Sequence, residues 1–66
     1  MIDFVHEAKN LIGQKVRVIT ENGNYTGKLL AVGDDALVLQ VRTNGRLRRL
    51  IIRIAEIIIL FSLLGV

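Results

Sequence analysis

The stretch KVRVITENGNYTGKLLAVGDDALVLQV, residues 15–41, contains three runs in which apolar and polar side chains alternate. In the first run Val16 and Val18 alternate with charged neighbours, and a period of two is typical of a β-strand with one buried face. The pair Asn22-Gly23 separates this run from the next, and we expect both residues to adopt positive φ in a two-residue hairpin turn. The stretch therefore predicts antiparallel strands joined by tight turns.

The second and third strands are expected over residues 25–32 and 36–43, with a turn at residues 33–35 between them. Gly27 interrupts the second strand, and a glycine inside a strand is typical of a bend or a bulge. A sheet built from these strands is therefore expected to curve strongly.

Downstream, a second Asn-Gly pair at residues 44–45 predicts a hairpin that leads to a fourth strand over residues 46–54. A fifth strand follows over residues 57–63, after a very short connection. Upstream, apolar residues at helical spacing predict a helix over residues 3–12 with Asp3 as its cap. We expect a mainly β fold in which a short N-terminal helix precedes a five-stranded, strongly bent antiparallel barrel of the SH3-like type, with its strands in meander order.

The composition limits what the chain can do. It has 66 residues, 52% of them hydrophobic, which fits a single domain over residues 1–66 and excludes a disordered chain. With no cysteine and one histidine, we expect no metal site and no cofactor. His6 and the adjacent acids Asp34 and Asp35 make no nucleophile–base pair, so we expect neither an enzyme nor a small-molecule substrate. The apolar run at residues 57–66 is about half a membrane-spanning helix, which predicts a cytoplasmic protein with no membrane partner.

Positive charge is concentrated in one part of the chain, whose net charge is +3. Five arginines, with no acid between them, are Arg42, Arg46, Arg48, Arg49 and Arg53. Such a cluster favours a polyanionic partner, with nucleic acid as the first candidate. The alternative is a solvated hairpin that keeps an apolar protein soluble. The sequence leaves both interpretations open.

Large aliphatic side chains exceed what a domain of this size buries, so another surface must cover the surplus, most simply a second copy of the chain. The fourth and fifth strands contain one acid, Glu56, so little protects their edges from pairing. We therefore expect a closed homo-oligomer in which the fourth strand of one subunit pairs with the fifth strand of the next. The residues expected at this interface are Ile52, Ile54, Ile57, Ile58 and Ile59.

These features resemble the Sm-like family, which includes bacterial Hfq, and look closest to a group of short bacterial Sm-like proteins. Residues 15–41 are similar to the family's first motif, with Gly27 as its strand glycine. The stretch RLIIRIAEIIIL, residues 49–60, is similar to its second motif, with matches at Ile52, Arg53 and Ile57. The first stretch also resembles the KOW segment of ribosome-associated SH3-like domains and, more faintly, a PRC-barrel. The Sm-like resemblance implies a barrel that assembles into a ring of six or seven subunits.

The same resemblance implies that the ring binds single-stranded RNA, with Arg53 near a shared pore. We expect Tyr25 to stack on bases and the hairpin arginines 42, 46, 48 and 49 to contact phosphates. Where the family has a base-contacting Asn, this chain has Leu37 and Val38, so we expect mainly electrostatic binding with weak selectivity between bases. The alternative function is a structural or assembly scaffold, with residues 61–66 covering the barrel mouth or pairing with another ring.

Overall fold

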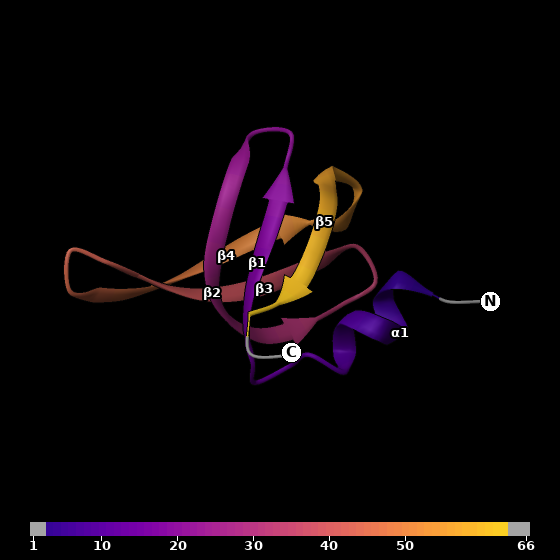
Figure 1. Cartoon of the computed structure of the whole chain (residues 1–66), viewed down its shortest axis with the longest axis horizontal. Helices are drawn as coiled ribbons and strands as arrows, with labels where there is room; N and C mark the ends of the chain where they lie inside the picture. The colour runs from indigo at the N-terminus through magenta and orange to yellow at the C-terminus, as the bar shows by residue number, and fades with distance from the viewer. Residues whose placement is uncertain (1–2, 64–66) are drawn as a thin grey trace.

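The computed structural model describes residues 3–63, so part of the apolar run at residues 61–66 lies outside the described residues. Its elements, in chain order, are helix α1 (Phe4–Lys9), strands β1 (Lys15–Thr20), β2 (Gly23–Val32), β3 (Ala36–Thr43) and β4 (Arg46–Arg53), the 3₁₀ turn η1 (Ile54–Glu56) and strand β5 (Ile57–Ser62) (Figure 1). The expected mainly β chain, with one short helix before five strands, is confirmed. The bounds differ from those predicted by a few residues at the ends.

Helix α1 is capped as predicted, because a side-chain oxygen of Asp3 accepts a hydrogen bond from the Val5 backbone N–H at 3.3 Å. The helix ends earlier than predicted, since the chain must turn at Gly13 (φ 92°) to enter the sheet. There the Gly13 N–H donates to the Leu29 carbonyl oxygen at 2.8 Å, which holds the helix close to β2. Within residues 3–63 no helix has the length and apolar character needed to cross a membrane.

The five strands form one antiparallel sheet with the order β4-β3-β2-β1-β5. The predicted meander is wrong at the last strand, because β5 lies beside β1 and not beside β4. The turn η1 carries the chain across to β1, where Leu60 lies opposite Val18 and packs with Ile57 against the core. Strands β4 and β5 are therefore the two edges of the sheet, and no ladder between them closes it within residues 3–63.

The core lies on one face of this curved sheet and follows the predicted alternation. Its buried residues come from every second position of β1 to β4 and are Val16, Val18, Leu29, Leu37, Leu39 and Ile52. Ile52, which the sequence suggested for a subunit interface, is only 8% exposed and belongs to this core. Its neighbour Ile51 points to the opposite face, because successive side chains of a strand alternate.

Strand β2 curves at the glycine that predicted a bend (Figure 1). A Cβ at Gly27 would collide with the backbone carbonyl oxygen of Gln40 and approach Cγ1 of Val41 to 2.9 Å. Only glycine therefore allows β3 to cross this close to β2. The two strands pair from Lys28 opposite Gln40 to Val32 opposite Leu37, and beyond Gln40 the β3–β4 hairpin projects from the body of the fold (Figure 1).

The two Asn-Gly pairs form different turns. Asn44 (φ 52°) and Gly45 (φ 78°) both have positive φ in a two-residue hairpin, which confirms the prediction. At the first pair Gly23 (φ 145°) is already the first residue of β2, and Asn22 does not have positive φ, so the prediction for Asn22 is wrong. The hydroxyl of Thr20 explains the shift, because it accepts from the Asn22 N–H at 3.1 Å and donates to the Gly23 carbonyl oxygen at 3.0 Å.

We predict that Gly27→Ala lowers the free energy of unfolding by about 1–3 kcal/mol, because the new methyl group must displace the backbone of β3. Gly33→Ala is the matched control, since its Cβ meets only the Ala36 carbonyl oxygen at 3.4 Å. Urea unfolding followed by circular dichroism measures both variants. Equal stability of the two would show that the close approach of β2 and β3 is unimportant.

A second prediction concerns the tip of the projecting hairpin. Gly45→Val should lower the free energy of unfolding by about 1–2 kcal/mol, because an L side chain is strained at φ 78°. Thr43→Val, at an exposed strand position of the same hairpin, should be nearly neutral. Thermal unfolding of both variants against the parent chain tests this, and a neutral Gly45→Val would contradict it.

Candidate nucleic-acid interface

Four of the clustered arginines lie on the β3–β4 hairpin, beyond the core, and are exposed: Arg42, Arg46, Arg48 and Arg49. In the ladder Arg42 is opposite Leu47, and Arg48 is opposite Val41. Because side chains alternate along a strand, Arg42 and Arg49 share one face of the hairpin, while Arg46 and Arg48 share the other. The hairpin therefore presents cations on both of its faces.

Arg53 lies at the opposite end of β4, where it is exposed and opposite Ala36. The strand rise places it about 23 Å from Arg46, so the structure does not bring the predicted pore arginine together with the hairpin tip. It lies instead beside the turn between β2 and β3, because the backbone N–H of the next residue, Ile54, donates to the Asp35 carbonyl oxygen at 2.8 Å. Two separate cationic positions result.

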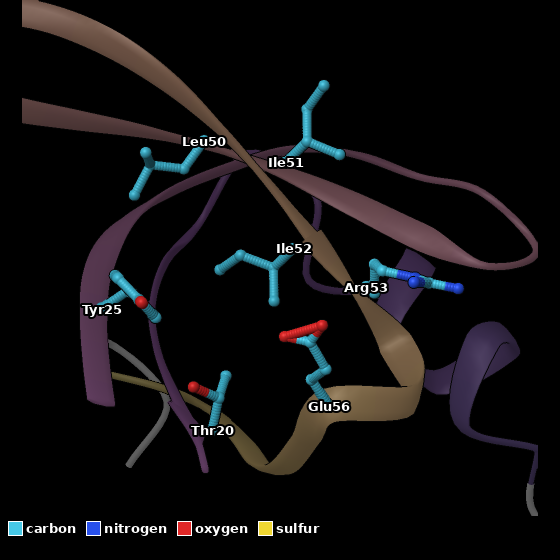
Figure 2. A pocket seen from close by; sticks show the side chains of 7 residues that line it. All are labelled: Thr20, Tyr25, Leu50, Ile51, Ile52, Arg53 and Glu56. Atoms are coloured by element: carbon cyan, nitrogen blue, oxygen red, sulfur yellow. The ribbon is translucent and has the colours of Figure 1, made fainter. Parts of the chain in front are cut away.

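A cavity of about 250 Å³ lies next to Arg53, between β1, β2, β4 and η1. Its lining residues are Thr20, Tyr25, Leu50, Ile51, Ile52, Arg53 and Glu56. Figure 2 shows Tyr25 on one side of this space and the Glu56 carboxylate inside it, while the Arg53 side chain extends away from it. The structure thus brings Tyr25 and Arg53, both predicted as RNA contacts, to one cavity, with the tyrosine ring half-buried at its wall.

Glu56 is a residue of this cavity that the sequence did not assign. The side-chain amide of Asn22 donates to its Oε1 at 3.4 Å. A carboxylate at this position repels a phosphate but accepts hydrogen bonds from N–H groups, so the cavity suits an uncharged base edge better than a nucleic-acid backbone. The only sequence signal is that Glu56 is the sole acid after residue 35, and its proximity to Asn22 depends on the tertiary fold.

The isoleucines predicted at a subunit interface fall into three environments. Ile58 and Ile59 are 62% and 48% exposed on the edge strand β5, whereas Ile54 and Ile57 are half-buried and Ile52 is in the core. Two more exposed apolar side chains were missed: Ile51, 75% exposed on β4, and Phe61 on β5. The alternation around the buried Ile52 was the signal that could have identified Ile51.

Acidic and basic side chains are separated in this fold. The described acids lie in the helical segments, the cap and the turns, and are Asp3, Glu7, Glu21, Asp34, Asp35 and Glu56. The strands carry all the described cations except His6 and Lys9, and none of these lysines and arginines forms an ion pair in the part of the chain that the structure describes. The described His, Asp and Glu side chains also form no group of three that could hold a metal ion. The strand surfaces are therefore suited to a polyanion.

One protein family matches the chain. Its model, described as "Domain of unknown function (DUF2642)", matches residues 4–61. Comparison with curated proteins and with solved structures found no match. The family description names no Sm-like or RNA-binding property, so the resemblance to Sm-like proteins stays a prediction from the motifs. Because the match covers all five strands and the helix, the chain belongs to the DUF2642 family.

Proposed function

We propose that this chain is a cytoplasmic, ring-forming protein of the Sm-like type that binds single-stranded RNA mainly through charge and with weak selectivity between bases. The observation that carries the proposal is the β3–β4 hairpin, which projects from the fold with exposed arginines on both faces and no acid among its residues. Phosphate contacts of this kind position a nucleic acid without reading its sequence. Tyr25, at the nearby cavity wall, offers an aromatic ring for stacking.

Assembly is the second part of the proposal. Strands β4 and β5 each have one edge without a partner in the described residues, and unpaired edges are templates for another chain. Both edges also carry exposed isoleucines, Ile51 on β4 and Ile58 and Ile59 on β5. Pairing β4 of one subunit with β5 of the next covers both edges, completes an Sm-like barrel-type arrangement and generates a closed ring of six or seven copies.

A scaffold that uses the same ring without nucleic acid is the second candidate. It is favoured by the exposed Phe61 and Leu63, which continue the apolar surface of β5 beyond what the core needs. In this alternative the arginines of the hairpin serve solubility or contacts between subunits. The two candidates share the ring and differ only in whether oligonucleotides bind.

We predict that the protein has a solution mass of six or seven times 7.4 kDa at micromolar concentration. Ile58→Lys should shift it toward the monomer, because a charge buried without a partner at a subunit contact costs several kcal/mol. Ile12→Lys is the control, since Ile12 is similarly exposed but lies between α1 and β1, away from both edges. Light scattering after size-exclusion chromatography measures the mass. A monodisperse monomer of the unchanged chain would overturn the ring.

We also predict binding to oligouridine and oligoadenine with similar affinities that fall steeply as salt rises, because phosphate contacts release counterions. Arg48→Ala should weaken binding by about eightfold at about 0.1 M salt and reduce the salt slope by about 1. Lys9→Ala removes the same charge from α1 and should have little effect. Fluorescence anisotropy with labelled oligonucleotides measures all three proteins.

Two results would contradict the RNA proposal. If the assembled protein binds no oligonucleotide at low salt, the scaffold candidate is correct. If Lys9→Ala and Arg48→Ala weaken binding equally, the attraction is a general effect of net charge and the hairpin is not an interface.

A further inference from the structure

A groove of about 570 Å³ lies on the outer face of the sheet, where the β3–β4 hairpin separates from β2. Its lining residues are Gly13, Lys15, Thr26, Gly27, Lys28, Gln40, Arg42 and Leu47. Three of these are cations and two carry polar side chains, and none is acidic. The groove is distinct from the cavity beside Arg53, with which it shares no lining residue.

The strand register explains why the charges meet. Lys15 on β1 is opposite Lys28 on β2, Lys28 is opposite Gln40 on β3, and Gln40 is opposite Arg49 on β4. Residues directly opposite each other share a face, so these four side chains form one row across four strands. The buried Val16, next in sequence to Lys15, points to the other face, which places the row on the solvent side.

The adjacent row repeats this character. Arg17 is opposite Thr26, and its Nε donates to the Thr26 hydroxyl at 3.4 Å. On the hairpin Arg42 and Leu47 face the same groove. Like charges directly opposite in a sheet are unfavourable, and Lys15 and Lys28 have no acidic partner in the described chain. A bound polyanion would relieve this repulsion.

We infer that this groove binds the sugar–phosphate backbone of single-stranded RNA, and the inference rests on the proposed function. Successive strands are about 4.8 Å apart, so a row that crosses four strands is longer than one phosphate group and fits several phosphates in sequence. The groove leads through Arg42 to the arginines of the hairpin, which continue the path. Thr26 and Gln40 supply uncharged donors between the cations. The groove assigns the lysines a role that the arginine cluster did not suggest.

The chain offers an internal control, because it has three lysines: Lys15 and Lys28 in the groove, and Lys9 on α1. All three are exposed, so each is open to acetylation in the free protein. We expect oligouridine to slow acetylation of Lys15 and Lys28 severalfold while Lys9 is unaffected, as read by mass spectrometry of peptides from the unchanged protein. Protection of all three lysines, or of none, while anisotropy shows bound oligouridine would overturn the groove and leave the proposed function standing.

Substitutions provide the second measurement. Lys15→Gln and Lys28→Gln should each weaken oligouridine binding by about eightfold at about 0.1 M salt and reduce the salt slope by about 1, with Lys9→Gln near the unchanged protein. If these variants bind normally while Arg48→Ala does not, the RNA runs along the hairpin alone and the groove inference fails. Inorganic polyphosphate is the competing ligand: protection of Lys15 and Lys28 by polyphosphate and not by oligouridine would overturn the assignment to RNA. Absence of any oligonucleotide binding would overturn the proposed function together with the groove.

Discussion

The close passage of β3 over β2 at Gly27 is the constraint on which the remaining architecture depends. The space that a side chain would occupy there is filled by the backbone of Gln40 and by Val41. This contact lets one long strand pair with β1 along its first part and with β3 along its second. The two halves of the sheet then cross steeply, as Figure 1 shows, and enclose the core residues between them. A flat sheet of the same strands would expose one side of that core.

The same crossing creates the two surfaces that carry the functional argument. Because the ladder between β2 and β3 ends at Lys28 and Gln40, the rest of the hairpin extends beyond the core with its arginines exposed on both faces. The angle that remains between β2 and the hairpin is the lysine-lined groove. Charge separation reinforces this arrangement, since the acids are confined to the cap, the helical segments and the turns. A polyanion that follows the strands therefore meets cations without crossing a carboxylate.

The sheet edges determine how the fold relates to copies of itself. With β5 beside β1, the edge strands are β4 and β5, and each displays isoleucine to solvent. The core uses the opposite faces of the same strands, through Ile52 on β4 and Leu60 on β5. Apolar residues on both faces explain why the hydrophobic content is high for a chain of 66 residues. Edge pairing between subunits and RNA binding on the hairpin use different surfaces, so one does not block the other.

Local patterns in the sequence were sufficient for much of the fold. Alternation of apolar side chains identified all five strands, Asp3 identified the helix start, and Asn44-Gly45 identified a true positive-φ hairpin, because each of these depends on residues that are neighbours in the chain. The arginine cluster was equally visible, since four of its members are consecutive or nearly so on one hairpin.

The tertiary structure alone decided what depends on distant segments. The partner of β5 could not be read from its sequence, because β1 and β4 offer similar apolar faces and the choice follows from packing around η1. The first Asn-Gly turn shifted because the Thr20 hydroxyl bonds across it. Lys15 and Lys28 are 13 positions apart and join one groove only through the strand register, and Glu56 reaches the cavity only because the β1–β2 turn lies beside η1. Side-chain type is a local property, whereas the grouping of side chains into a site is set by which strands pair and where they bend.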